Sequence, residues 1–557
     1  MTGQARRGGM PSDTHTPEDG ARYRADGWWR DRTLLDDFLA TVEAVPDKVA
    51  IVAHHDGRPL PEVVSYRQLG AYVDRCARAL IGLGILPGDV VSIQLPNGWQ
   101  FPVAALATMR SGAIPSPIPP IYRELELSKM LRHAKSKVLI VQSSFRGYSH
   151  EELALKMKRE VPTLEHVIAV GATSAGALDF DTAMLSADLD PDASARAALD
   201  ALRPQADDPV VLLFTSGTTG TPKAAVHTHN SIWSAGFALP DSITLTRDDV
   251  CFMASTMGHL TGFYWGMLLS LSQGQKVVYQ DVWNARQLVE LIELERISWT
   301  LSATPFAIDL VEMKKRAGNR DISSFRAFVC GGAPIPPHVA VEVKQELGVD
   351  LISLWGCTEV GICTIHLPGA SVETLAASDG MPVRLMELRI VDDEQQPVAD
   401  GEEGRLQVRG PGIFAGYLQQ PELTADLRTD DGWYDTGDRG RRVADGGIRI
   451  SGRSKDIIIR GGQNVPVVEI ENELVLMPSV REIAVIGVPD DRLGERGCAV
   501  IVPEGAPPTL ADLQRRLETT GMAKQFWPER IEIVDALPRT PAGKIQKFVL
   551  RERFSKR

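Results

Sequence analysis

A run of glycine and hydroxyl residues directly after a short apolar segment restricts the fold of this chain more than any other feature. The apolar segment spans 210–214, and the run that follows reads Thr215-Ser216-Gly217-Thr218-Thr219-Gly220-Thr221-Pro222-Lys223. Glycines allow a tight turn that presents backbone N–H groups to an anion, hydroxyls add donors, and lysine adds positive charge. The composition alone also describes a flexible surface linker, but the adjoining strand-like segment and the lysine favour a loop that binds a polyphosphate.

The run differs from the Walker A motif of common nucleotide hydrolases and kinases. Gly217 and Gly220 are too close together, and Ala224 follows Lys223 where that motif has Ser or Thr. The usual NTPase and kinase interpretations therefore lose their main support.

Helical and extended patterns alternate through the first half of the chain. Apolar residues recur at helical spacing in 69–80, and 90–93 and 138–141 are short apolar runs typical of strands buried in a parallel sheet. This alternation predicts an α/β fold with a large layered N-terminal domain.

Changes in pattern along the chain predict three units. Residues 1–20 are rich in Gly, Pro, Thr and Asp and are expected to form a disordered tail. The N-terminal domain is expected at 21–454, with a small β-rich subdomain from about 392 to 454. A compact α+β pattern fills 456–557, which is long enough for a C-terminal domain.

The nine-residue run 215–223 resembles the phosphate loop of the adenylate-forming superfamily, which includes acyl-CoA synthetases, peptide-synthetase adenylation domains and beetle luciferases. Other motifs of that superfamily follow in order across roughly residues 30–550. The resemblance implies an ATP-binding enzyme. Phosphate contacts are then expected from the loop's first residues and a catalytic charge from its lysine: Thr215, Ser216, Gly217, Thr218, Thr219, Gly220 and Lys223.

A second motif, Trp355-Gly356-Cys357-Thr358-Glu359, follows an extended run. A carboxylate at a strand end beside a triphosphate can hold Mg²⁺. The motif resembles the superfamily's aromatic-Gly-x-Thr-Glu segment, although Tyr is commoner where this chain has Trp. The resemblance implies Glu359 on Mg²⁺, Thr358 on the α-phosphate and Trp355, Gly356 and Cys357 beside the nucleotide. Taken alone, a Thr-Glu pair is more often a surface turn or a helix cap.

Three further segments match nucleotide and acid contacts of the superfamily. Cys330-Gly331-Gly332-Ala333-Pro334 resembles the segment along the adenine and the acyl pocket, with Gly331 and Trp355 facing the acid. Asp438, which ends Trp433-Tyr434-Asp435-Thr436-Gly437-Asp438, and Arg453 are the implied ribose contacts. His259 matches a position that flanks the acid pocket. It is expected to shape the pocket, because a carboxylate substrate is already ionised and needs no general base.

The C-terminal domain is expected to be mobile and to bring a different segment to the site in each half-reaction. Lys544, in Pro538-Arg539-Thr540-Pro541-Ala542-Gly543-Lys544-Ile545, matches the lysine that offsets charge at the α-phosphate. The resemblance implies a hinge at Lys455 that moves this lysine away after adenylation. The segment Arg460-Gly461-Gly462-Gln463-Asn464 would then line a coenzyme A tunnel, with Gly461 and Gly462 permitting close approach.

The expected substrate is an apolar monocarboxylic acid, whether medium-chain, alicyclic or aryl. The segments expected to form its pocket are free of Lys and Arg, and Glu359 is their one acid: 255–263, 303–306, 329–333 and 355–362. Residues 23–38 resemble the cyclohexanecarboxylate-CoA ligase branch. The predicted reaction is adenylation by ATP and transfer of the acyl group to coenzyme A, with release of AMP and pyrophosphate.

Three other functions use the same motifs. An acyl-AMP ligase that loads a carrier protein would share every one of them. A luciferase-like oxygenase would need an oxygen step that nothing in the sequence indicates. A non-catalytic nucleotide-binding regulator is disfavoured because the expected functional side chains are all present: Lys223, Glu359, Asp438, Arg453 and Lys544.

Charge and cysteine content limit the binding partners and the cellular compartment that are expected. A net charge of −12 gives no support for binding nucleic acid or anionic membranes. Six scattered cysteines without a C-x-x-C pair argue against a disulfide scaffold or a structural zinc site. The sequence shows neither a signal-type apolar region in 1–20 nor a run of about 18 apolar residues. A cytoplasmic monomer or homodimer is expected.

Overall fold

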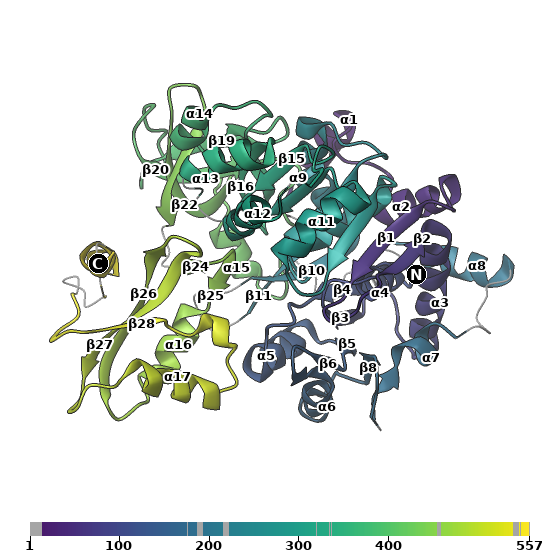
Figure 1. The fold of residues 1–557 in the computed structure, drawn as a ribbon, viewed down its shortest axis with the longest axis horizontal. Helices are drawn as coiled ribbons and strands as arrows, with labels where there is room; N and C mark the ends of the chain where they lie inside the picture. The colour runs from purple at the N-terminus through teal and green to yellow at the C-terminus, as the bar shows by residue number, and fades with distance from the viewer. Residues whose placement is uncertain are drawn as a thin grey trace.

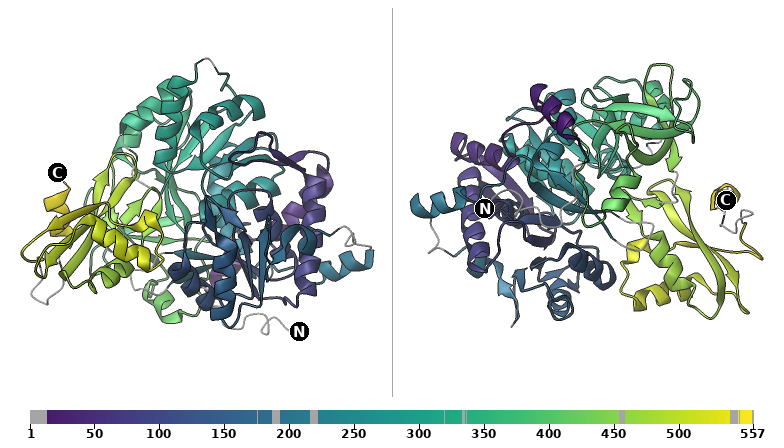
Figure 2. Two further views of the ribbon diagram at one scale, coloured as in Figure 1. Left: turned by 60° about the horizontal axis from the view of Figure 1, so that its bottom comes forward. Right: turned by 180° about the vertical axis from the view of Figure 1, so that it is seen from behind.

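A computed structural model describes residues 14–174, 176–186, 193–215, 222–318, 320–332, 335, 337–453, 458–538, 545 and 547–555. Helices cover the sheets of a large N-terminal body, and a smaller C-terminal domain packs along one side of it (Figures 1 and 2). This mixed α/β architecture confirms the predicted fold class. Within the described residues, no helix combines the length and apolar character needed to cross a bilayer.

The first sheet is parallel, and its strands run in the order β4-β3-β5-β8-β9. Successive residues of β5 (Val138–Gln142) point to opposite faces: Val138 and Ile140 join one apolar core and Leu139 and Val141 join another. Both faces are therefore covered, as continuous apolar strands of a parallel sheet require. The other strands are β3 (Val90–Gln94), β4 (Ile114–Pro117), β8 (His166–Val170) and β9 (Leu178–Asp179).

The helices before and after these strands are amphipathic. The long helix α3 (Tyr66–Gly82) buries Leu69, Val73, Cys76 and Leu80 on one side, as their spacing predicted. The others in this region are α2 (Leu34–Ala44), α4 (Gln100–Arg110), α5 (Glu124–Ala134), α6 (His150–Glu160), α7 (Phe180–Met184) and α8 (Ala193–Asp200), with the short hairpin β6 (Ser144–Phe145) and β7 (Tyr148–Ser149).

The second sheet has the order β18-β17-β16-β15-β14-β12-β13-β1-β2, and the run from β16 to β1 is parallel. Its parallel strands are β1 (Val49–His54), β12 (Val250–Met253), β13 (Lys276–Gln280), β14 (Trp299–Ser302), β15 (Ala327–Cys330) and β16 (Asp350–Cys357). Antiparallel strands β2 (Glu62–Ser65), β17 (Gly361–Ile365) and β18 (Met381–Pro382) close its two edges. Its helical connections and neighbours are α9 (His229–Ile243), the π-helix η3 (Thr261–Leu269), α10 (Ser270–Ser272), α11 (Ala285–Glu295), α12 (Thr304–Arg316), α13 (Pro337–Glu342), η4 (Val343–Leu347) and α14 (Val372–Ala377).

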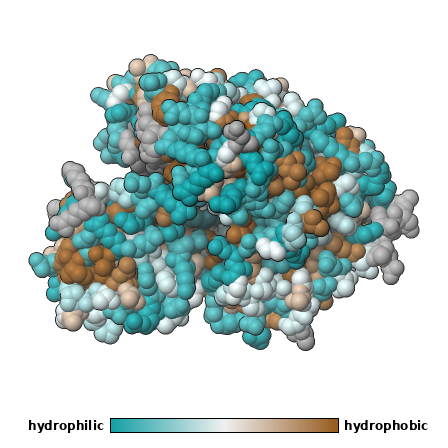
Figure 3. Space-filling view, in the orientation of Figure 1, coloured by the Kyte–Doolittle hydropathy of each residue, from teal (hydrophilic) through white to brown (hydrophobic). Residues whose placement is uncertain are grey.

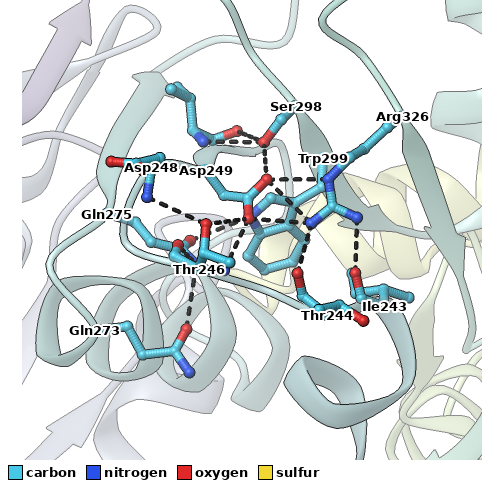
Figure 4. Close-up of polar contacts among 11 residues, drawn as sticks. Ile243, Thr244, Thr246, Asp248, Asp249, Gln273, Gln275, Ser298, Trp299 and Arg326 are labelled. Carbon is cyan, nitrogen blue, oxygen red and sulfur yellow. Dashed lines mark hydrogen bonds and ion pairs between the residues drawn. The ribbon is translucent and has the colours of Figure 1, made fainter.

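A polar network fastens the amino ends of three parallel strands of this sheet (Figure 4). The Asp249 carboxylate accepts hydrogen bonds from Arg326 Nε at 3.0 Å and from Ser298 Oγ at 2.7 Å. These residues directly precede β12, β15 and β14, respectively. The opposite, carboxyl ends of the same strands are where ligands bind in open α/β sheets.

A small third sheet, β10-β11-β21, carries the predicted phosphate loop. The strand expected at 210–214 is confirmed as β10 (Pro209–Thr215), which pairs antiparallel with β11 (Lys223–Thr228). Thr215 and Lys223 are register partners, so the two ends of the run lie side by side. The edge strand is β21 (Gly416–Tyr417), and α15 (Pro421–Asp426) follows it.

An antiparallel sheet of order β19-β20-β22-β23 ends the N-terminal body. Its strands are β19 (Glu387–Val391), β20 (Gly404–Arg409), β22 (Tyr434–Arg442) and β23 (Ile448–Arg453). The sheet begins at Glu387, earlier than the boundary near residue 392 that composition suggested, because β19 carries no unusual composition to mark it.

The C-terminal domain is a sheet with helices on both faces. Strands β24 (Ile458–Arg460), β25 (Gln463–Val465), β26 (Val480–Asp490), β27 (Gly494–Pro503) and β28 (Arg530–Ile533) form the sheet. On one face, Val485 and Ile501 pack in the same core as α16 (Val467–Leu474), α17 (Leu510–Thr519) and η5 (Lys524–Phe526). On the other, Ile486 and Val500 pack with α18 (Lys547–Phe554).

The described N-terminal end is folded onto the body. Helix α1 (Pro17–Ala25) buries Tyr23, and Trp29 Nε1 donates to the carbonyl of Pro411 at 3.1 Å. The expected tail of residues 1–20 therefore overlaps this helix from Pro17 onward. The Thr16 side chain caps α1 through the Asp19 N–H, a start signal that the glycine- and proline-rich composition obscured.

Candidate active site

A cavity of about 320 Å³ opens where the second and third sheets meet the C-terminal domain. The surface is hollowed between that domain and the rest of the molecule (Figure 3). Segments that follow β12, β14 and β15 line the cavity, which places it at the carboxyl ends of the parallel strands. Among the described residues that line it, only Lys223 and Glu359 carry charge.

The ends of the phosphate-type loop lie at this cavity. Thr215 and Lys223 both line it, and Lys223 is buried with 8% of its surface exposed. The Lys223 Nζ lies 5.5 Å from the ring centroid of Tyr417. Residues 216–221 of the loop between them, which include the predicted contacts Ser216, Gly217, Thr218, Thr219 and Gly220, lie outside the described residues.

Thr358 and Glu359 lie in the tight turn between β16 and β17 and line the same cavity as Lys223. The hairpin needs glycine at Gly356, because a Cβ there would lie 1.8 Å from the carbonyl oxygen of Gly361. Gly361 itself has φ +70° and packs on Ala235, where a Cβ would lie 2.4 Å from the Ala235 Cβ. The two glycines thus allow the hairpin to be tight and to pack closely on α9.

Three hydrogen bonds hold this turn, one from β11, one from the chain leading into β21 and one from β21 itself. The Phe414 N–H donates to the Glu359 carbonyl at 2.8 Å, and His227 Nε2 bonds the Thr358 carbonyl at 2.7 Å. The Tyr417 hydroxyl donates to Glu359 Oε1 at 2.6 Å. Burial lowers the pKa of His227 to about 4 and raises the pKa of Tyr417 well above its usual value, so the imidazole is neutral and the phenol keeps its proton.

Sequence reasoning missed both His227 and Tyr417. His227 lies four residues after Lys223 on the same strand face, which is a signal that alternation along β11 could have provided. Tyr417 gave no such signal, because its approach to Glu359 depends on pairing between β11 and β21.

Glu359 fits the requirements of Mg²⁺. The ion is usually held by one or two carboxylates together with substrate phosphates, and does not need a cage of protein ligands. Among the residues that the structure describes, no cluster of three or more His, Cys, Asp and Glu side chains could hold a metal. A single carboxylate beside the phosphate loop is therefore a suitable anchor for magnesium that arrives with a nucleotide.

The expected ribose contacts lie at the β22–β23 pair. Thr436 and Gly437 line the cavity, and the next residue, Asp438, is buried. Asp438 is the register partner of Arg453, so the backbones of the two predicted ribose residues are adjacent. The side chain of Arg453 lies outside the description, as do Ala333 and Pro334 of the predicted adenine segment.

Apolar side chains make up much of the cavity lining. They are Leu260, Trp265, Leu301, Phe306, Leu354 and Ile362, and the predicted residues His259, Gly331 and Gly332 line the cavity with them. Gly331 allows close packing there, since a Cβ would lie 2.5 Å from Leu354 Cδ1.

Two aromatic residues of the expected pocket segments, Trp355 and Phe263, are not among the described residues that line the cavity. Trp355 lies between two cavity-lining residues of β16 and packs against the core. Phe263 is fully buried in the core, and Trp265 and Phe306 line the cavity. Sequence reasoning could not assign the facing of residues in η3, because a π-helix shifts the usual helical spacing.

The C-terminal domain completes the cavity with Ile459, Gly461, Gly462 and Gln463. Gln463 Oε1 lies 2.9 Å from His259 Nε2, which joins the two domains. Burial lowers the pKa of His259, so the neutral ring donates this bond. Gly462 lies against Ala303, where a Cβ would come within 3.3 Å of the Ala303 Cβ. The segment predicted to line a thiol tunnel is therefore in the cavity.

Lys544 and Lys455 lie outside the described residues. The neighbour of Lys544, Ile545, packs with Leu550 on the sheet face that α18 covers. The other face of the C-terminal sheet carries the helices that meet the N-terminal domain. On that face Phe526 approaches Tyr122, with ring centroids 5.8 Å apart. In this arrangement residues 461–463 lie in the cavity. Ile545 packs on the opposite face of the C-terminal sheet, away from the N-terminal domain.

A body of this kind with a small C-terminal domain across one cavity is the architecture of adenylate-forming enzymes. The solved structure of the amide bond synthetase McbA from Marinactinospora thermotolerans superposes with a TM-score of 0.81 at 28% identity, and the match covers 94% of this chain and 100% of that one.

The chain belongs to the AMP-binding enzyme family, whose model matches residues 38–418; the model of the AMP-binding enzyme C-terminal domain matches residues 469–544. It is 33% identical over 539 residues to a medium-chain fatty-acid–CoA ligase of Escherichia coli, across 96% of this chain and 93% of that protein. It is 34% identical over 545 residues to a salicyl-AMP ligase / salicyl-S-ArCP synthetase of Mycobacterium tuberculosis, across 97% and 94%. This chain is thus an adenylate-forming acid ligase.

Proposed function

We propose that this enzyme activates an apolar monocarboxylic acid with ATP and transfers the acyl group to coenzyme A, releasing AMP and pyrophosphate. The observation that supports this best is the composition of one cavity. Lys223, Thr358 and Glu359 of the N-terminal domain share it with the glycine pair Gly461-Gly462 of the C-terminal domain. Nucleotide chemistry and thiol access therefore have a common site.

The apolar lining of the cavity supports an uncharged acid tail. Lys223 and Glu359 are the charged residues among its described lining, and both are assigned to the nucleotide and its metal, so a second carboxylate or an amino group on the substrate would be buried without a partner. Trp265 and Phe306 are among the lining residues, which suits a medium-length alkyl, alicyclic or aryl group. The relationship to a medium-chain fatty-acid–CoA ligase agrees with this substrate class.

In the first half-reaction the substrate carboxylate attacks the α-phosphorus of ATP, and pyrophosphate leaves. The barrier lies in bringing two anions together, so the enzyme has to supply positive charge and alignment. Lys223 supplies charge at the phosphate loop, Thr358 donates to the α-phosphate, and Glu359 would hold Mg²⁺, which offsets phosphate charge. Lys544 is the proposed second cation, Asp438 and Arg453 the proposed ribose clamp, and Gly332, Ala333 and Pro334 the proposed adenine contacts.

In the second half-reaction a thiol attacks the acyl carbonyl of the adenylate, and AMP leaves. The described arrangement fits this step, since 461–463 lie at the cavity and the chain beside Lys544 packs on the far face of the C-terminal sheet. Both glycines have positive φ, +54° and +79°, and leave room for a narrow pantetheine arm. Rotation about Lys455 would exchange the two arrangements.

The experiment is an exchange assay of labelled pyrophosphate into ATP over a panel of acids, with AMP release measured in parallel with and without coenzyme A. We expect exchange with medium-chain, alicyclic or aryl acids and faster AMP release when coenzyme A is added. Absence of exchange with every acid would contradict adenylation. Exchange without acceleration by coenzyme A would contradict coenzyme A as the acceptor.

A carrier protein is the second candidate acceptor, and the likeness to the salicyl-S-ArCP synthetase favours it. The same assay separates the two when a phosphopantetheinylated carrier protein replaces coenzyme A. We place the enzyme in the cytoplasm as a monomer or homodimer, which agrees with six cysteines that are all free.

A further inference from the structure

We infer that Tyr417 is a positioning residue for Glu359, and that its hydroxyl fixes the carboxylate that would hold magnesium. The inference rests on the proposed role of Glu359 in the adenylation step. Its basis is the 2.6 Å hydrogen bond from the Tyr417 hydroxyl to Glu359 Oε1. Among the described residues, the Tyr417 hydroxyl is the donor that the structure shows for this carboxylate, and it engages Oε1.

Glu359 needs such a support because of where it lies. It is in the turn between β16 and β17, lines an open cavity and makes no ion pair with any described residue. A glutamate side chain has three rotatable bonds, and an unsupported one would sample several orientations. A buried phenol that donates to one oxygen selects a single orientation, and a hydrogen bond to a charged acceptor is stronger than a neutral one.

Tyr417 is itself held rigidly. Its side chain is buried, with 3% exposed, and its ring packs edge-on against Phe414 with centroids 4.8 Å apart. Its own N–H donates to Thr424 Oγ1 at 3.0 Å. On either side of it, the N–H groups of Ala415 and Leu418 donate to β11 at 2.8 and 2.9 Å.

The same strand pairing connects Tyr417 to the phosphate loop. Tyr417 is the register partner of Ala225, two residues from Lys223 on β11. The Lys223 Nζ lies 5.5 Å from the Tyr417 ring centroid. One small sheet therefore sets both the lysine and the orientation of the carboxylate, which keeps the separation of the two charged groups constant.

The test is Tyr417→Phe, which removes the hydroxyl and keeps the ring. The first readout is binding without turnover: calorimetric titration with α,β-methylene-ATP, in excess Mg²⁺ and again in EDTA. We expect the Kd in Mg²⁺ to rise about tenfold, the factor that one charge-assisted hydrogen bond supports, and the Kd in EDTA to stay within twofold of wild type. The second readout is the half-saturating Mg²⁺ concentration in pyrophosphate exchange, which should rise about tenfold while the KM for the acid stays within twofold.

Tyr66→Phe is the matched control. Tyr66 is fully buried, its hydroxyl donates to the Gln275 carbonyl at 2.6 Å, and it does not line the cavity. The Tyr66→Phe variant reports how the loss of one buried tyrosine hydrogen bond affects stability alone. Its Mg²⁺ dependence should equal that of wild type. Unchanged Kd and unchanged Mg²⁺ dependence in Tyr417→Phe would overturn the inference, as would equal changes in the two variants.

The wild-type titration separates this inference from the proposed function. If the wild-type enzyme binds the analogue in a Mg²⁺-dependent way and Tyr417→Phe does the same with equal affinity, the positioning role alone is wrong. If wild-type binding is independent of Mg²⁺, the role of Glu359 in the proposed function is wrong, and the role of Tyr417 fails with it.

Discussion

His259 of the N-terminal domain bonds Gln463 of the C-terminal domain, with Nε2 and Oε1 2.9 Å apart, and both residues line the cavity. This contact belongs to the arrangement that we assign to acyl transfer. We predict that Gln463→Leu slows thioester formation from a supplied acyl-adenylate by about fivefold, the factor that corresponds to a hydrogen bond worth about 1 kcal/mol. Pyrophosphate exchange should change by less than twofold, because adenylation uses the other arrangement.

Gln514→Leu is the control for that variant. Gln514 is also in the C-terminal domain, but its side chain donates to the Pro528 carbonyl within that domain. It should leave both half-reactions near wild type. A Gln463→Leu enzyme that lost both half-reactions equally would show that the contact does not discriminate between them.

Lys544→Ala and Lys455→Pro should have opposite effects. Removal of the Lys544 charge is expected to lower pyrophosphate exchange by about 100-fold or more and to spare thioester formation from supplied acyl-adenylate. Proline at Lys455 restricts the backbone that must rotate and should impair thioester formation more than exchange. Separate assays of the two half-reactions check both variants. Parallel loss in each variant would argue against alternation of the C-terminal domain.

Gly356→Ala should inactivate the enzyme through geometry, since the added Cβ would lie 1.8 Å from the Gly361 carbonyl oxygen. The hairpin has to open, and Thr358 and Glu359 move with it. A displacement of about 1 Å at a catalytic group costs about 100-fold in rate, so we expect at least that loss in pyrophosphate exchange. Gly82→Ala is the control, because a Cβ there meets nothing within 4 Å at a helix end. Normal exchange in Gly356→Ala would mean that the turn tolerates displacement.

The free energy of unfolding should fall on acidification because of two buried histidines, one on β11 and one on α9, which follow the phosphate loop in the chain. Burial lowers the pKa of His227 to about 4 and of His229 to about 3, against an ordinary value near 6.5 in the unfolded chain. The folded state therefore binds fewer protons, and the stability it has above pH 6.5 is lost as the pH falls toward 4.

At pH 5 each of these histidines should cost on the order of 1–2 kcal/mol relative to pH 7.5. Thermal melts across this range measure the loss. His227→Asn should show a shallower decline of Tm with pH than wild type, whatever its Tm at pH 7.5. An identical slope would mean that His227 does not contribute to the acid sensitivity.

The sequence predicted the helices and strands that are marked by residues within or next to them in the chain. Helix α17 (Leu510–Thr519) begins at such a local signal, because Thr509 and Asp512 form a capping box at its start. The strand ahead of the phosphate loop is β10, as its apolar run indicated. The extended run ending at Leu354 continues to Cys357, since pairing with β17 extends β16 into the motif itself.

Contacts between distant segments escaped prediction for a physical reason. Which residues of η3 and β16 line the cavity depends on a π-helical stretch and on strand pairing within the packed sheet, so no spacing in the sequence pointed to Trp265. The bonds to the Thr358–Glu359 turn depend on how β11 and β21 pair. Tertiary packing decides these placements, and no spacing in the sequence records them.

Product analysis in a single turnover distinguishes acyl transfer to coenzyme A from all other outcomes. Enzyme in excess over ATP is mixed with Mg²⁺ and an acid that supports exchange, first without and then with coenzyme A, and the products are separated by chromatography. Acyl-adenylate should accumulate in the first case and be replaced by equal amounts of acyl-CoA and AMP in the second. Acyl-adenylate that persists unchanged in the presence of coenzyme A would contradict acyl transfer to that thiol.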